Sequence, residues 1–127
     1  MLTEVAGEIL HFPPQPRQQP NALEIDSELQ ADSARLTPVG ELDIATAPQL
    51  DQEVRSLLAR SVREVVIDLS RLTFIDSSAL RLFIVLNERS AEQGWTLRLV
   101  RPTGQVLNVF AITGAEDNLP FIDENDR

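Results

Sequence analysis

The segment LTFIDSSALRLF, residues 72–83, decides the fold of this chain. An apolar approach meets an Asp-Ser-Ser corner, after which apolar residues recur at helical spacing. Asp76 suits a helix N-cap because its carboxylate can accept hydrogen bonds from the unpaired N–H groups that open a helix. Ser77 and Ser78 then lie in the first turn, where the helix dipole tolerates a phosphate. The corner therefore predicts either a plain helix start or a serine that can be modified without unfolding the domain.

Composition limits the class of protein. A chain of 127 residues with 43% hydrophobic residues has room for one domain and a modest core. It has no run of about 18 apolar residues and no recognisable signal sequence, so we expect a cytoplasmic protein without membrane insertion. The absence of cysteine excludes disulfides and thiolate chemistry, and the single His11 cannot build a metal cluster. We therefore expect no metal and no cofactor.

The charge pattern indicates the kind of partner. A formal charge of −9, from 20 acidic and 11 basic side chains, repels nucleic acid and anionic lipid and favours a basic protein partner. Every strongly basic residue is arginine, which excludes a lysine Schiff base and the lysine of a phosphate-binding loop.

The first part of the chain predicts a tail and a hairpin. Residues 1–20 are rich in proline and show no sustained period, which indicates a flexible tail, with docking of Ile9, Leu10 and Phe12 as the alternative. From Leu23 apolar and acidic residues alternate as in a half-buried strand, and residues 35–42 return as a second strand after a turn. Pro38 removes one donor from that strand, so we expect an irregularity or an outward-facing position there.

A helix and a central strand should follow. Thr46 and Gln49 have capping-box spacing, Pro48 lies in the tolerated first turn, and a helix should run to about Arg60. Its apolar face has helical spacing and consists of Leu50, Val54, Leu57 and Leu58. Residues 65–69 are apolar without alternation, which is typical of a strand covered on both faces.

The corner should start a helix over residues 77–92 that ends at Gly94. We expect most of its apolar residues in the core, with one or two of Leu82, Val85 and Leu86 exposed as a partner surface. The remaining elements follow in order: a strand over residues 95–100, a helix capped by Thr103 with Val106, Leu107 and Phe110 inward and a stop at Gly114, and a last short strand over residues 119–122.

The element order ββαβαβα(β) predicts a single α/β domain over residues 21–123, followed by an acidic tail at 124–127. The sheet should be mixed and mostly parallel, with four to five strands and right-handed crossovers. The carboxyl ends of parallel strands meet at one edge of a sheet. Asp43 and the Asp76-Ser77 corner should therefore lie close together, although they are far apart in sequence.

Several motifs together resemble the STAS domain as found in bacterial anti-sigma factor antagonists, over roughly residues 22–123. The motifs are Gly40-Glu41-Leu42-Asp43, Val65-Val66-Ile67-Asp68-Leu69, Phe74-Ile75-Asp76-Ser77-Ser78-Ala79-Leu80, Val109-Phe110 and Thr113-Gly114. The Asp-Ser-Ser corner is moderately specific alone and strongly so in combination with Gly-Glu-Leu-Asp earlier in the chain. Two positions depart from the family pattern: Ala79 stands where the family usually has glycine, and Ala115 replaces a larger apolar residue.

The resemblance implies a phosphorylation-switched interaction module of monomeric form. Ser77 would be the phosphoacceptor, and the partner-binding residues would be Asp43, Asp76, Ser78, Ala79 and Leu80. The unphosphorylated protein would bind an anti-sigma factor that is also a serine kinase and so release a sigma factor. A serine phosphatase is a further partner that this scheme allows.

Two other functions compete with this one. A serine hydrolase lacks support because His11 is the only imidazole and no Gly-x-Ser-x-Gly elbow occurs, so we expect no enzyme activity. A STAS subunit of another assembly, such as a stress-signalling scaffold or the soluble subunit of a lipid-transport complex, stays open as the alternative.

Overall fold

Strand β3 (Ser33–Leu42) lies at the centre of a mixed sheet, to which every other strand is joined directly or through a neighbour. The computed structural model describes residues 9–12 and 23–123. The strand order is β1-β2-β3-β4-β6-β7, with β5 paired to β3. Strand β2 is antiparallel to both of its neighbours, β1 and β3, and all remaining pairs are parallel. This confirms the predicted α/β class and the antiparallel start.

The other strands are β1 (Leu10–Phe12), β2 (Glu24–Gln30), β4 (Glu64–Asp68), β5 (Leu72–Ile75), β6 (Thr96–Val100) and β7 (Phe121–Ile122). The helices are α1 (Ala47–Ala59), α2 (Ser77–Gln93) and α3 (Gly104–Thr113), followed by a short 3₁₀ helix (Ala115–Asn118). None of the helices in the described ranges is long and apolar enough to cross a membrane.

Strand β3 changes its parallel partner along its length. Its first half pairs with β4 as far as Leu36, and its last residues pair with β5 from Gly40 onward. Pro38 lies between these two stretches, opposite Ile25 of β2. The register shifts at Gly40/Glu41, where Gly40 has φ +117°. At Pro38 itself, where an irregularity or an outward-facing position was expected, the pairing with β2 is regular. The irregularity lies at Gly40/Glu41, in the stretch of β3 that pairs with β5.

Two strands were not predicted. Strand β5 was read as an apolar approach to the corner, because it is four residues long and its two central side chains are exposed, which gives no strand period. Residues 10–12 were predicted as part of a flexible tail, and this was wrong because they form strand β1 along the edge of β2. The rest of that tail and the acidic tail at 124–127 lie outside the described residues.

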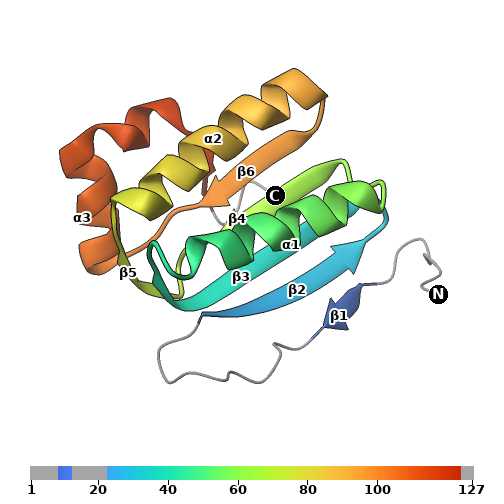
Figure 1. Cartoon of the computed structure of the whole chain (residues 1–127), viewed down its shortest axis with the longest axis horizontal. Coiled ribbons are helices and arrows are strands. Elements are labelled where there is room, and N and C mark those ends of the chain that lie inside the picture. The colour runs from blue at the N-terminus through green and yellow to red at the C-terminus, as the bar shows by residue number, and fades with distance from the viewer. Residues whose placement is uncertain (1–8, 13–22, 124–127) are drawn as a thin grey trace.

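Helices α1 and α2 lie side by side in front of the sheet in Figure 1, and their apolar faces close the core. The predicted face of α1 is buried except for Leu58, which is half-buried. On α2, Leu82 and Val85 are half-buried, so neither of these two candidates for a partner surface is fully exposed. Leu86 is fully buried, so the suggestion that it could be exposed was wrong.

Helix α3 follows the prediction closely, with Val106 and Phe110 buried and Leu107 half-buried. Thr103 precedes the helix as expected but makes no side-chain capping hydrogen bond. Gly114 ends the helix in the left-handed conformation, with φ +77°. The predicted last strand is present as β7, parallel to β6.

The face of the sheet opposite the helices is charged. Arg35 on β3 pairs with Asp68 on β4 at 2.5 Å between Nη2 and Oδ2, and Arg98 on β6 pairs with Glu64 at 2.7 Å. Burial raises the pKa of Asp68, but hydrogen bonds from Ser70 and the charge of Arg35 outweigh that effect and hold the pKa below its ordinary value. The ion pairs therefore let polar side chains occupy partly buried positions on this face.

Candidate functional site

Ser77 is the first residue of α2, and its side chain is exposed. Strand β5 ends two residues earlier, and its pairing with the end of β3 places the corner at the carboxyl edge of the sheet. The Ser77 hydroxyl makes no hydrogen bond with any other residue that the structure describes. The hydroxyl is therefore open to solvent and to a partner.

Asp76 holds the corner from both sides. Its Oδ1 accepts hydrogen bonds from the backbone N–H groups of Ser78 (2.9 Å) and Ala79 (3.1 Å), which confirms the predicted N-cap. Its Oδ2 accepts from the backbone N–H of Ile44 at 3.2 Å. One carboxylate thus ties the start of α2 to the loop between β3 and α1.

Asp43 shapes that loop. Its Oδ1 accepts from the backbone N–H groups of Ala45 (2.9 Å) and Thr46 (3.1 Å). The Thr46 hydroxyl accepts from the backbone N–H of Asp43 (2.9 Å) and donates toward the carbonyl of Glu41 (2.9 Å). The predicted capping box is wrong, because Thr46 makes no capping bond to the helix and the Gln49 amide donates instead to the carbonyl of Leu23 at 2.8 Å.

The structure brings the two predicted acidic positions together, as expected from the meeting of strand ends. Leu42 accepts a hydrogen bond from the backbone N–H of Asp76 at 3.3 Å, so the β3–α1 loop and the corner are directly joined. Both carboxylates accept hydrogen bonds from backbone N–H groups, and Asp43 also accepts one from the Thr46 hydroxyl. Neither carboxylate accepts a hydrogen bond from the Ser77 hydroxyl. Their visible role is to fix the backbone around the serine.

The remaining predicted partner residues divide into two groups. Ser78 is half-buried and lines a groove between α1 and α2. Ala79 and Leu80 are 0% and 9% exposed and pack in the core, so their side chains are not available for direct contact with a partner. The reason is helical geometry, because residues along α2 rotate by about 100° per position and the third and fourth face the sheet.

Sequence reasoning missed the apolar surroundings of the corner. Ile44, whose backbone N–H bonds to Asp76, is 75% exposed, and Phe74, two residues before Asp76 on β5, is 47% exposed. Ile44 lines the groove between α1 and α2, whereas Phe74 lies beside Val106 and Val109 of α3. The signal in the sequence was Ile44, an apolar residue inside a polar turn.

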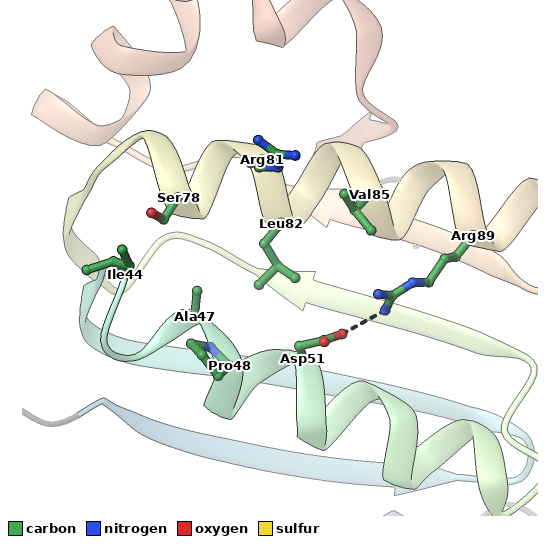
Figure 2. A pocket seen from close by; sticks show the side chains of 9 residues that line it. All are labelled: Ile44, Ala47, Pro48, Asp51, Ser78, Arg81, Leu82, Val85 and Arg89. Carbon is green, nitrogen blue, oxygen red and sulfur yellow. Dashed lines mark hydrogen bonds and ion pairs between the residues drawn. The ribbon is translucent and has the colours of Figure 1, made fainter.

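The groove between α1 and α2 adjoins this corner (Figure 2). It has a volume of about 340 Å³. Its apolar lining consists of Ile44, Ala47, Pro48, Leu82 and Val85. At its far end the Arg89 guanidinium pairs with Asp51 at 2.8 Å, as the dashed line in Figure 2 shows.

The chain belongs to the STAS-domain family, because the sequence model of that family described as "Mlab, STAS domain" matches residues 19–122. Among curated relatives, the anti-sigma-B factor antagonist of Staphylococcus aureus (strain NCTC 8325 / PS 47) is 28% identical over 82 residues, which is 61% of this chain and 72% of that protein. The protein of the same name from Staphylococcus epidermidis is 26% identical over 78 residues, with the same coverage of both chains.

Solved structures agree with this placement. An anti-sigma factor antagonist from Mycobacterium paratuberculosis superimposes with a TM-score of 0.69 at 25% identity, covering 81% of this chain and 87% of that one. The anti-sigma factor antagonist SpoIIAA in its unphosphorylated form has the same fold, with a TM-score of 0.67 at 20% identity and coverage of 80% and 89%. The two likenesses show that the chain has the same fold as these solved structures.

Proposed function

We propose that this chain is an anti-sigma factor antagonist that is switched by phosphorylation of Ser77. In its unphosphorylated form it binds an anti-sigma factor that is also a serine kinase, and this binding releases a sigma factor in the cytoplasm. The kinase is the partner, and the chain itself is a substrate and a binding module without catalytic activity of its own.

One observation carries the proposal: the Ser77 hydroxyl is exposed and unbonded among the described residues, at the start of a helix whose backbone Asp76 already caps. A kinase can therefore reach the hydroxyl without removing a capping interaction. The flanking Ile44 and Phe74 supply apolar contact area for a partner that covers the serine.

The relatives support the same reading. The Staphylococcus proteins are anti-sigma-B factor antagonists, and SpoIIAA has been solved in both unphosphorylated and phosphorylated forms. Adding phosphate at the first residue of a helix is compatible with a folded domain, because negative charge near a helix N-terminus is stabilising by about 0.3–1 kcal/mol.

A second function stays in view because the matching family model carries the name Mlab, and because a STAS-like fold also occurs in the anion transporter Slc26a9, with a TM-score of 0.60 at 15% identity. In that case the chain would be a STAS subunit of another assembly, and its corner would bind a partner without phosphorylation.

Phosphorylation of the purified chain by its partner kinase separates the two functions. The kinase is recovered by co-purification from the native cell, identified, and then incubated as a pure protein with the chain and Mg-ATP. We expect one added phosphoryl group, mapped to Ser77 by fragmentation mass spectrometry.

Two serine variants serve as matched controls. Ser78→Ala should still accept one phosphoryl group, whereas Ser77→Ala should accept none. Labelling of Ser77→Ala at the parental level, or a bound partner with no kinase activity toward the chain, would contradict the proposal and favour the other assembly.

A further inference from the structure

Arg81 lies four residues after Ser77 on α2, and it is exposed. Its guanidinium forms no ion pair with any residue in the described ranges 9–12 and 23–123. Arg89, two turns further along the same helix, is by contrast held by Asp51. In a chain of formal charge −9, Arg81 is thus a cation beside the corner that is available to an added anion.

Helical geometry places Arg81 within reach of position 77. Side chains four residues apart are neighbours, with Cβ atoms about 5–6 Å apart, and helical side chains lean toward the N-terminus. The i,i+4 spacing therefore puts the first turn of α2, where Ser77 lies, within reach of the Arg81 side chain. An anion followed by a cation four residues later is also the favourable order for a helical ion pair.

We propose that Arg81 is the residue of this chain that binds the phosphate when Ser77 is phosphorylated. The inference rests on the proposed function, in which Ser77 is the phosphoacceptor. A serine phosphate carries about −1.5 to −2 charges and three acceptor oxygens, and a guanidinium is the side chain best suited to bind two of them at once. Asp76 cannot take this part, because it is an anion whose oxygens already accept backbone hydrogen bonds.

Arg81 also borders the groove between α1 and α2, together with Ser78 and Leu82. In Figure 2 Arg81 lies on the side of α2 away from α1, whereas Leu82 points toward α1. In the unmodified chain Arg81 is free to pair with a carboxylate beside an apolar segment of the partner. In the phosphorylated chain the phosphate occupies Arg81, so phosphorylation adds negative charge and also removes the cation that the partner would use.

The pairing is tested without any kinase by introducing phosphoserine at position 77 during synthesis of the full chain. Titration of the phosphate by phosphorus NMR then compares the parental sequence with Arg81→Gln. A cation that stabilises the dianion lowers the phosphate pKa, so Arg81→Gln should raise the midpoint by about 0.2–0.4 pH units at low salt. The difference should shrink in about 1 M salt, where the screening length falls to about 3 Å.

Two further variants decide whether the effect belongs to the charge at this position. Arg81→Lys should keep most of the lowered midpoint, and Arg89→Gln should leave it unchanged. The Nε–Hε signal of Arg81 in nitrogen-proton spectra should move with the same midpoint as the phosphate. A midpoint that is equal in the parental chain and in Arg81→Gln, or an Arg81 signal that ignores the phosphate, overturns the inference.

Failure of this inference and failure of the proposed function give different results. If the purified kinase phosphorylates Ser77 but the phosphate midpoint ignores Arg81, only the role of Arg81 is wrong. If the installed phosphate pairs with Arg81 but no kinase modifies Ser77, the proposed function is wrong and the pairing stands. With the kinase in hand, Arg81→Gln should bind it several-fold more weakly in the unphosphorylated form.

Discussion

At the scale of single residues, the corner combines two carboxylates that accept backbone hydrogen bonds with one serine whose hydroxyl makes none in the described part of the chain. Asp76 accepts three backbone hydrogen bonds and Asp43 accepts two, while the Ser77 hydroxyl is unbonded within the described part of the chain. We therefore expect substitution of Ser77 to change the free energy of unfolding little, whereas substitution of Asp76 should lower it.

Substitution of Asp76 should separate its two roles. Asp76→Ala loses the cap and should lower the free energy of unfolding by about 1–2 kcal/mol. Asp76→Asn keeps an oxygen for Ser78 and Ala79 but turns an amide donor toward the Ile44 N–H, so it should cost less than half as much. Urea unfolding of both variants measures the difference, and equal losses would show that the cap is not what stabilises the corner.

Asp43 should prove to be a loop residue in stability measurements. Asp43→Asn retains the oxygen that Ala45 and Thr46 use, so its unfolding curve should match the parental one, while Asp43→Ala should lose about 1 kcal/mol. If Asp43 also contacts the partner, Asp43→Asn will weaken kinase binding at unchanged stability. A loss of several kcal/mol for Asp43→Asn would instead make its negative charge essential to the fold.

Ser77 itself should act as a switch without affecting folding. Ser77→Ala should bind the kinase constitutively, and Ser77→Asp should bind weakly because it brings a negative charge into the interface. Both should melt near the parental temperature, since a carboxylate at the start of α2 is compatible with the helix dipole. Calorimetric titration against the purified kinase checks this, and equal affinities of the two variants would rule the switch out.

At the scale of elements, the exchange of partners along β3 positions the site. From Gly40 onward β3 pairs with β5, and Asp76 and Ser77 follow directly after β5. The exchange takes place at a register shift, where Gly40 has φ +117°. Residues with a side chain rarely adopt that conformation, so the position favours glycine. The groove beside the corner then results from α1 and α2 starting next to each other at the same edge.

Gly40→Ala should therefore damage the β3–β5 pairing. We expect a loss of about 1–3 kcal/mol in unfolding free energy, with faster amide hydrogen exchange in β5 than in β4. Gly94→Ala is the matched control, because Gly94 also has a positive φ of +79° but ends α2 in open space, away from β5. Faster exchange in β5 for Gly94→Ala as well would contradict a local role for Gly40.

At the scale of the whole molecule, the two faces of the sheet differ in what covers them. Helices α1 and α2 cover one face and shape the site (Figure 1). The other face carries the ion pairs Arg35–Asp68 and Arg98–Glu64. A lowered pKa of Asp68 means that its ionised form stabilises the folded state.

This linkage predicts part of the acid unfolding profile. Because the folded pKa of Asp68 lies below the unfolded value of about 3.9, its contribution is complete above that value and is lost as the pH falls through the folded pKa. Asp68→Asn should be less stable than the parental chain at pH 7, with a difference that shrinks toward pH 2 in urea titrations. Ser70→Ala should show the same trend to a smaller degree, and a constant difference at all pH values would refute the assignment.

The sequence by itself determined the elements whose signals are local. These signals depend on residues close together in the chain, and each element is present as predicted. They are the alternation in β2, the apolar run of β4, the helical periods of α1 and α2, the cap at Asp76 and the stops at Gly94 and Gly114. Strand ends meet at one edge in any parallel sheet, so the nearness of Asp43 and Asp76 could also be inferred.

Only the tertiary structure decided what depends on contacts between distant segments. Strand β5 forms because the end of β3 no longer pairs with β4 and is free to pair with β5. Strand β1 forms by pairing with the edge of β2. The bond from the Ile44 N–H to Asp76, the burial of Ala79 and Leu80, and the groove that Arg81 borders all join residues of different elements. Backbone pairing and packing across the sheet set these features, and neither leaves a period or a local motif from which they could have been predicted.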